Sequence, residues 1–419
     1  MSIAITGLGC IGPLGFGTKH TWLNALAGKS CIVNLPSDYP EMPVRLYAPV
    51  DEGVLNDALL QTQIIEKPKK FMRQADDFVT FSVLAAEQAI DDANFMPSYS
   101  TNDVAVVIGS AIGGLPMVED NILTMASRGP RKVSPYWVPG GLPNIPAGYI
   151  SKLWGFKGPN LSPTTACASG AHSIVTGAML LQAGLADVVI AGGSESTRCH
   201  AAHAGFGALR ALSHSEQPEG ASRPWDKDRN GFVLAEGSGI LVLERLSDAE
   251  QRGANIHGVL SGYGMTGDAH HITSPDPSAE QHERAMRLAM KQAGVSSPTD
   301  IGYINAHATS TLAGDIVESR AIAQLYGDDL NKVKVSATKS MHGHLLGGTG
   351  AYEAILTLLS LQHQIALPTI HLDHPDPALP TGFNPVAHHA QPLNTQYAFS
   401  NSFGFGGTNV SLLFQRPAS

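Results

Sequence analysis

The sequence predicts an α/β protein made of two similar halves, in which helices pack on a mostly parallel sheet. Apolar segments typical of strands alternate with segments of helical periodicity, an order that favours parallel strands. The same alternation occurs before and after about residue 250. Glycine accounts for 44 of the 419 residues, which indicates tight turns and close contacts between backbones. We therefore expect a duplicated α/β unit, divided into residues 1–250 and 251–419.

The first half begins with an apolar segment and a glycine-rich turn, which match neither a dinucleotide-binding pattern nor a P-loop. Apolar runs and helical spacing predict a strand and turn at 2–15, a helix at 78–95, a strand at 103–114, a helix at 169–187, and strands at 188–196 and 237–246. The helix that begins near residue 169 is apolar on nearly all faces, so we expect it to be buried.

The second half repeats this order. The same criteria predict a strand at 257–265, an amphipathic helix at 280–294, a strand at 300–309, a helix at 315–327, a strand at 332–339, an apolar helix at 347–364, and a hairpin at 397–414. No low-complexity segment or flexible linker separates the halves, so we expect them to pack together as one body.

Charge and cysteine content exclude several classes of protein. The net charge of −9 argues against binding to nucleic acid or to an anionic membrane, because both need a basic face. The chain has no run of about 20 apolar residues that would span a membrane. Its N-terminus lacks the basic residues of a secretory signal. The four cysteines fit neither a zinc site nor a disulfide framework, so we expect reduced thiols in a cytoplasmic protein.

One cysteine stands among very small residues, in the segment PTTACASGAH at 163–172. Cys167 is placed where a helix is expected to begin, and the helix dipole there favours the thiolate. A dipole contribution of up to roughly 2 kcal/mol would lower the thiol pKa by about one unit. Cys167 is therefore a candidate nucleophile. The alternative at this point is a small cysteine of the buried core, which is common.

Two histidines follow predicted strands, in NAHATSTLAGD at 305–315 and TKSMHGHLLGGTGAYE at 338–353. Loops at strand ends are where α/β folds build their sites. A thiol can hold an acyl group while His307 and His344 donate hydrogen bonds to a developing oxyanion or enolate. His342 and His344 are two residues apart, but no further ligand lies at zinc spacing beside them, so we expect no metal site.

Four motifs together, TTACASG, NAHATST, TKSMHGHLLG and NSFGFGGTN, resemble the β-ketoacyl-[acyl-carrier-protein] synthases, most closely the elongating synthase II type. The resemblance extends from AITGLG to GGTNVSLLF, which is nearly the whole chain. It implies the thiolase fold, in which two βαβαβαββ halves form a five-layered α-β-α-β-α sandwich. It also implies a homodimer, with a heterodimer including a chain-length partner as the alternative.

The resemblance implies a reaction as well. Cys167 would accept an acyl chain from acyl carrier protein, and malonyl-carrier protein would decarboxylate and attack the thioester. The product is a 3-oxoacyl chain two carbons longer, as in fatty acid biosynthesis. The residues that match the family's catalytic set are Cys167, His307, His344 and Lys339. Phosphopantetheine arrives on the carrier protein, so no resident cofactor is expected.

Further residues match the supporting parts of the family site. Backbone N–H groups of Cys167 and Phe405 match the oxyanion hole, and Phe405 also matches the mobile gate. Glu353 is the expected counter-charge of the buried lysine, because a buried ammonium needs one. The expected substrate-binding residues are Thr309 and Thr311 for the pantetheine amides, Ile112 and Phe206 for the acyl pocket, and Pro275.

The carrier protein is acidic in this family, and this chain is itself acidic, so docking requires a local basic surface. The candidate docking residues are Arg131, Lys132, Arg73 and Arg210, with Lys67, Lys69 and Lys70 beside Arg73.

Two positions depart from the family pattern. Ala308 replaces the usual glycine after His307, where its methyl group narrows the pantetheine tunnel or has no effect. His342 replaces the usual threonine near the buried lysine, either as an inert surface change or as a change in the loop that carries His344. Both bear on substrate choice more than on reaction type. The same catalytic set would serve a dedicated polyketide or polyene pathway.

Two other interpretations are disfavoured by specific residues. A degradative thiolase needs a second cysteine near the C-terminal glycines, and NSFGFGGTN has none. A non-catalytic chain-length partner subunit lacks the nucleophilic thiol, whereas this chain has Cys167.

Overall fold

The computed structural model describes residues 2–36, 42 and 44–417. One continuous sheet contains five main strands from each half. The first-half strands are β1 (Ile3–Gly12), β5 (Val104–Gly109), β6 (Asn160–Leu161), β7 (Val188–Glu195) and β9 (Gly237–Arg245). The second-half strands are β10 (Gly258–Gly267), β11 (Ile301–Asn305), β12 (Lys334–Ser336), β15 (Tyr397–Gly404) and β16 (Thr408–Gln415).

The two halves share one strand order. From the centre of the sheet outward, the first half runs β1, β9, β7, β5, β6 and the second runs β10, β16, β15, β11, β12. If the five strands of each half are numbered along the chain, both orders are 1-5-4-2-3. The central strands β1 and β10 pair over three residues only, from Ile3–Leu260 to Ile5–Gly258. The sheet order is thus that of a duplicated unit.

The expectation of a mostly parallel sheet is wrong for the middle of the molecule. The outer strands are parallel, since β5 pairs with β6 and β7, and β11 pairs with β12 and β15. The inner pairs, β1 with β9, β9 with β7, β10 with β16 and β16 with β15, are antiparallel. The connection from β15 to β16 is only three residues long, and a connection that short can join antiparallel strands only.

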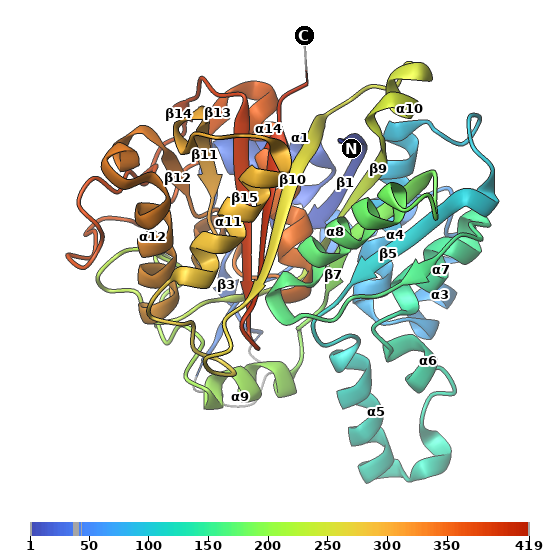
Figure 1. Ribbon diagram of the computed structural model, residues 1–419. Coiled ribbons are helices and arrows are strands. Elements are labelled where there is room, and N and C mark those ends of the chain that lie inside the picture. Colours follow the sequence, from blue (N-terminus) through green and yellow to red (C-terminus); the bar gives the residue numbers. More distant parts are fainter. Residues whose placement is uncertain (1, 37–41, 43, 418–419) are drawn as a thin grey trace.

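Helices form three layers around the two halves of the sheet, as Figure 1 shows. The buried pair α8 (Ser169–Gln182) and α14 (Thr349–His363) lies between the halves and shares one apolar core with both. The outer face of the first half is covered by α4 (Asp77–Ala93) and α7 (Ile145–Trp154). The outer face of the second is covered by α11 (Glu280–Ala293) and α12 (Leu312–Tyr326). This is the five-layered arrangement of the thiolase fold.

Glycine allows the outer helices to approach the central strands. A Cβ atom on Gly9 of β1 would lie 2.0 Å from the carbonyl oxygen of Ala85 in α4. In the second half, a Cβ on Gly264 of β10 would lie 1.9 Å from the carbonyl oxygen of Ala285 in α11. Both contacts exclude any side chain, so equivalent strands of the two halves use glycine for the same purpose.

The other elements connect this framework. Two helices that periodicity did not predict, α5 (Leu115–Arg128) and α6 (Trp137–Gly141), extend downward from the body in Figure 1. The remaining helices are α1 (Thr18–Leu26), α2 (Glu52–Gln61), α3 (Pro68–Gln74), α9 (His200–Ala208), α10 (Leu246–Gln251) and α13 (Lys339–His342). The remaining strands are β2 (Gly15–Phe16), β3 (Val33–Asn34), β4 (Leu46–Ala48), β8 (Leu234–Ala235), β13 (Ile365–Ala366) and β14 (Gln391–Pro392).

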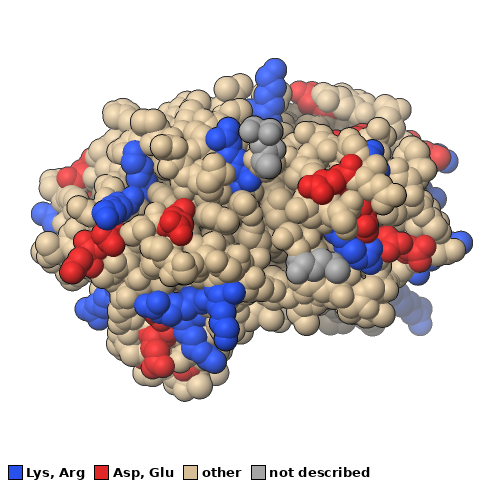
Figure 2. Space-filling view, turned by 45° about the horizontal axis from the view of Figure 1, so that its top comes forward, with Lys and Arg blue, Asp and Glu red and all other residues tan. Residues whose placement is uncertain are grey.

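Within the described part of the chain, every helix is too short or too polar to cross a membrane. On the face shown in Figure 2, Lys and Arg side chains are interspersed with Asp and Glu, and no single sign of charge dominates.

Candidate active site

Cys167 lies in a short 3₁₀ turn, Ala166–Ala168, that leads directly into α8. Ala166 adopts a left-handed conformation, with φ of 49°, a strained backbone that is often found at functional sites. Two other residues with positive φ stand near the predicted histidines, namely Ser310 and Leu346. The thiol is at a helix start, as the sequence predicts, and only 8% of the residue is exposed.

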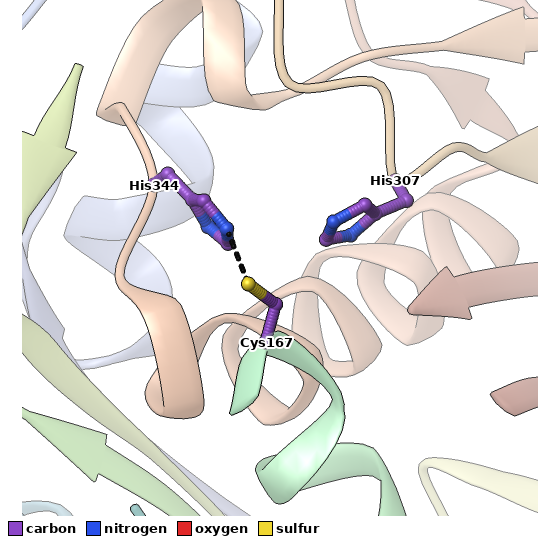
Figure 3. Close-up of side chains that lie close together, drawn as sticks. All are labelled: Cys167, His307 and His344. Carbon is purple, nitrogen blue, oxygen red and sulfur yellow. Dashed lines mark hydrogen bonds between the residues drawn. The ribbon is translucent and has the colours of Figure 1, made fainter. Parts of the chain in front are cut away.

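His344 contacts the thiol directly. Its Nε2 lies 3.0 Å from Sγ of Cys167, and the two residues are 177 positions apart in the chain (Figure 3). Its Nδ1 lies 3.0 Å from the hydroxyl oxygen of Thr349, at the first turn of α14. A hydrogen bond at Nδ1 fixes the ring and leaves Nε2 directed at the sulfur.

His307 reaches the same sulfur from the other side (Figure 3). It follows β11, and its backbone N–H donates to the carboxylate of Glu318. The imidazole rings of His307 and His344 are 5.4 Å apart and nearly perpendicular, at 79°. The sulfur and one ring nitrogen of each histidine all lie within 4.8 Å of one another. The structure therefore brings the three predicted residues together.

Lys339 is almost fully buried in α13 and pairs with Glu353 of α14. Its Nζ lies 2.6 Å from Oε2 of the carboxylate, and both side chains are 1% exposed. The hydroxyl of Thr338 donates to the other carboxylate oxygen at 2.9 Å. The expected counter-charge of the lysine is thus present. Removing one partner of such a pair would leave an uncompensated buried charge.

The pKa of Cys167 differs from the sequence-based expectation. Burial raises the pKa of this thiol to about 11, whereas Lys339 and the backbone N–H groups of Phe405 and Cys167 lower it. The expectation of a lowered pKa is wrong because desolvation outweighs the nearby positive charge and the backbone N–H groups. The resting residue is a thiol, and it needs a base to become a nucleophile.

The histidines can supply that base. Burial, together with the Lys339 ammonium, lowers the pKa of both His307 and His344 well below the usual value. Both imidazoles are therefore neutral near pH 7. A neutral ring can accept the thiol proton through Nε2 of His344, after which the thiolate attacks an electrophile. This pairing of a nucleophile with an oriented base is the arrangement required for acyl transfer.

A cavity of about 440 Å³ opens onto Cys167. Phe405, which follows β15, lines this cavity. The backbone N–H groups of Phe405 and Cys167 both favour the charged form of the sulfur, because each lowers the pKa of the thiol. All five predicted substrate-binding residues also line the cavity: Ile112, Phe206, Pro275, Thr309 and Thr311. The hydroxyl oxygens of the two threonines lie 3.1 Å apart. A mostly apolar cavity with a few polar groups is typical of a small-molecule site.

Two buried carboxylates that sequence reasoning missed hold the loops of the site in place. Glu195 accepts hydrogen bonds from the backbone N–H groups of Ala111, Ile112 and Gly347. Glu318 accepts from the N–H groups that follow β11, at residues 307 and 308. The signal in the sequence was an acidic residue within an apolar stretch, which either pairs or accepts several hydrogen bonds when buried.

The two departures from the family pattern are both buried. Ala308 lines the cavity, and its N–H donates to Glu318. His342 is fully buried, with Nε2 3.2 Å from the hydroxyl oxygen of Thr338 and 3.8 Å from Glu353. The interpretation of His342 as a surface change is therefore wrong, because α13 places it against the buried lysine–glutamate pair.

The basic residues lie at separate places. Arg131 and Lys132 are exposed in the turn that follows α5. Arg73 is exposed on α3, in a hollow that Lys67, Lys69 and Lys70 also line. Of the four candidate docking residues, Arg210 is the one that lines the cavity at Cys167.

The chain matches two family models, described as "Beta-ketoacyl synthase, N-terminal domain" over residues 1–249 and "Beta-ketoacyl synthase, C-terminal domain" over residues 257–373. The 3-oxoacyl-[acyl-carrier-protein] synthase 2 of Rhizobium meliloti is 42% identical, over 99% of this chain and 98% of its own. The protein of the same name from Staphylococcus aureus is 43% identical, over 99% of this chain and 98% of its own.

Solved structures agree with these sequence matches. A β-ketoacyl synthase from Burkholderia phymatum superposes with a TM-score of 0.89 and 31% identity, covering 100% of both chains. The type II polyketide ketosynthase solved with its acyl-carrier protein and bound to the hexaketide has a TM-score of 0.90 and 28% identity, covering 100% of this chain and 99% of its own. Family models, relatives and structures all converge, and this chain belongs to the β-ketoacyl synthase family.

Proposed function

We propose that this protein catalyses the decarboxylative condensation of malonyl-acyl-carrier protein with an acyl chain held on Cys167, the elongating step of fatty acid biosynthesis. The observation that carries the proposal is the 3.0 Å contact between Nε2 of His344 and Sγ of Cys167, with His307 on the other side of the sulfur. The chain is accordingly an acyltransferase. The thiol comes from residues 1–250 and both histidines come from residues 251–419.

The first half-reaction loads the acyl chain. His344 accepts the proton of Cys167, and the sulfur attacks the thioester carbonyl of the acyl-carrier protein. The N–H groups of Cys167 and Phe405 donate to the oxyanion that forms. The tetrahedral intermediate then collapses and expels the pantetheine thiolate, which takes the proton held by His344, so that the ring is neutral again and the acyl group remains on Cys167 as a thioester.

The second half-reaction forms the new carbon–carbon bond. Malonyl-carrier protein enters along Thr309 and Thr311, and neutral His307 donates an N–H to its thioester oxygen. His344 donates as well once its ring is in the tautomer with the proton on Nε2, in which the hydroxyl of Thr349 donates to Nδ1. Loss of CO₂ leaves an enolate, which attacks the acyl thioester. The Cys167 thiolate leaves and takes up a proton from solvent, because the proton of the resting thiol has already left on the pantetheine thiol. Apart from that proton, these steps use only groups of this chain and of the two thioesters, and we propose no resident cofactor or metal.

The test is stoichiometric turnover. The purified protein, given an acyl-carrier protein and malonyl-carrier protein, is expected to release one CO₂ for each 3-oxoacyl product two carbons longer. Release of CO₂ without an elongated product, or hydrolysis of the acyl thioester instead, would overturn the proposal.

A polyketide or polyene pathway is the second candidate, and one observation favours it: solved neighbours include a ketosynthase bound to the hexaketide and "the ishigamide ketosynthase/chain length factor". Their identities, 28% and 29%, are lower than the 42% of the synthase 2 relative. Fatty acid elongation is therefore the leading assignment. The two candidates are separated by comparing turnover of carrier proteins that bear saturated acyl chains with turnover of carrier proteins that bear conjugated ones.

Ile112 is expected to set the acyl chain length. It lines the cavity, and its N–H is held by Glu195 at 3.3 Å. The Ile112→Phe variant adds bulk to the acyl pocket and is expected to reduce kcat/KM for long acyl chains by about tenfold while sparing short ones. The measurement is turnover over a series of acyl-carrier proteins of increasing chain length. An unchanged chain-length profile would place the acyl pocket elsewhere.

The partners we propose are acyl carrier protein and a second copy of this chain. The net charge of −9 repels an acidic carrier protein at long range, so a local basic surface must guide it. Arg131 and Lys132 are exposed in the short turn that follows α5, and Arg210 lines the cavity at Cys167. We propose docking over these residues and Arg73.

Charge reversal tests this docking surface. The double variant Arg131→Glu, Lys132→Glu is expected to raise KM for acyl-carrier protein about tenfold and to leave kcat nearly intact, because rim charges steer encounter. A small acyl-thioester mimic serves as the control, since it does not reach these residues. For the wild type, KM should rise with salt. A KM that depends on neither salt nor the reversal would place the carrier protein elsewhere.

A further inference from the structure

The two active-site histidines are held in different ways. Nδ1 of His344 has a hydrogen-bond partner in Thr349. Nδ1 of His307 is buried, and among the described residues it has no partner. A ring nitrogen without a hydrogen bond does not fix the rotation of the imidazole. Something else must hold His307 in the orientation that catalysis requires.

Aromatic packing supplies that restraint. Phe403, at the end of β15, presents its ring to His307 with centroids 6.1 Å apart and planes at 64°. This edge-to-face geometry is a favoured one. Together with the ring of His344, Phe403 encloses the imidazole of His307.

Phe403 is in turn backed by a third histidine, His282 of α11. The two rings are stacked, with centroids 3.9 Å apart and planes at 10°. His282 is 4% exposed and lines the same cavity as Cys167. Burial lowers its pKa to about 4, so the ring that packs on Phe403 is neutral at physiological pH.

Hydrogen bonding does not explain why an imidazole is placed there. Nε2 of His282 lies 3.9 Å from the carboxylate of Asp268, beyond hydrogen-bond distance. Its Nδ1 is buried without a partner among the described residues. Within the described part of the chain, the contact that defines this side chain is therefore its flat face against Phe403.

We propose that His282 is a positioning residue for His307: its ring holds Phe403, and Phe403 holds the imidazole that donates to the malonyl thioester. The inference rests on the proposed function, since it assigns His307 to malonyl decarboxylation. It predicts that decarboxylation depends on the flat ring of His282 and not on the hydrogen-bonding nitrogens of that ring. It also predicts that the effect disappears once His307 is removed.

The experiment measures the two half-reactions separately for the full-length protein. Decarboxylation is followed as CO₂ released from malonyl-carrier protein, and acylation as transfer from acyl-carrier protein to Cys167. The His282→Ala variant is expected to lower kcat for decarboxylation about tenfold with little change in KM, since misplacing a catalytic group by about 1 Å can cost up to 10²-fold. Acylation is expected to stay within about twofold of wild type. The His282→Phe variant, which keeps the stack, should restore most of the decarboxylation rate.

Two controls make the outcome decisive. Met290→Ala also truncates a buried side chain of α11, eight residues beyond His282 in the apolar core of the second half, and it should leave both half-reactions within about twofold. In the His307→Ala background, His282→Ala should cause no further loss, because residues that act through one group are not additive.

Four results overturn the inference: a His282→Phe variant as slow as His282→Ala, equal loss of both half-reactions, an unchanged rate in His282→Ala, or a full additional loss in the His307→Ala background. Failure of the proposed function is distinguishable, because it would appear in the wild type itself, as absence of the elongated product or as absence of CO₂ release. If wild type decarboxylates and His307→Ala does not, a normal His282→Ala variant rejects this inference alone.

Discussion

The Cys167→Ala variant is expected to lose acyl transfer completely while remaining folded. The substitution removes one sulfur atom from a turn already made of alanines, and its helix, α8, keeps all its other contacts. Transfer from acyl-carrier protein, followed by intact-protein mass spectrometry, should show no adduct. The thermal unfolding midpoint should move by only a few degrees, since about 1 kcal/mol shifts Tm by roughly 2–4 °C at 150–250 residues and by less in a longer chain such as this one.

Cys199 provides the matched control. It is also a buried free thiol, in the same apolar cluster as Cys167. Nδ1 of His203 lies 3.0 Å from the backbone carbonyl oxygen of Cys199. By contrast, Nε2 of His344 lies 3.0 Å from the sulfur of Cys167. The Cys199→Ala variant should retain acyl transfer. Equal condensation by Cys167→Ala and wild type would refute Cys167 as the nucleophile.

The second large effect concerns the two histidines. The His307→Ala and His344→Ala variants are each expected to slow malonyl decarboxylation by about 10²–10³, the usual size for loss of one oxyanion donor. Acylation should survive better than decarboxylation in both. It should be slower in His344→Ala, because Nε2 of His344 is the group in contact with the thiol. Equal loss of the two half-reactions in both variants would contradict this division of roles.

The pH dependence follows from the same groups. Burial and the Lys339 charge lower the pKa of both histidines well below the usual value. Protonation of either ring begins only when pH falls to these lowered pKa values, so both rings keep one protonation state across the physiological range. Wild-type decarboxylation should therefore be flat between about pH 6 and pH 8, where an ordinary histidine would titrate. An acid limb centred near pH 6.5 would show that the rings are not desolvated as the structure indicates.

The sequence predicted the site through local motifs and the fold through repeated order. Cys167, His307 and His344 each stand in a short stretch whose small residues and strand ends mark a site, although long stretches of chain separate them. The resemblance to a known family then placed Phe405, Lys339 and the cavity-lining residues. Each of these was found at the cavity or, for Lys339, in the buried pair behind it.

What the sequence could not supply depends on desolvation and on long-range pairing. The helix start at Cys167 was correct, but the sign of its pKa change follows from burial by segments distant in the chain. Glu195 and Glu318 hold loops from several elements, and an acidic residue in an apolar stretch does not reveal which distant segments it binds. Strand–helix alternation likewise predicts parallel pairs, whereas the first and last strands of each half meet in antiparallel pairs at the centre.

The most direct test of the account is to trap the acyl-enzyme and then discharge it. Wild type is incubated with an acyl-carrier protein alone, and the peptide that contains Cys167 is examined by mass spectrometry. We expect one acyl group per chain, attached to Cys167. Added malonyl-carrier protein should then remove it as a 3-oxoacyl product two carbons longer. An adduct on another residue, or an adduct on Cys167 that malonyl-carrier protein does not discharge, would contradict it.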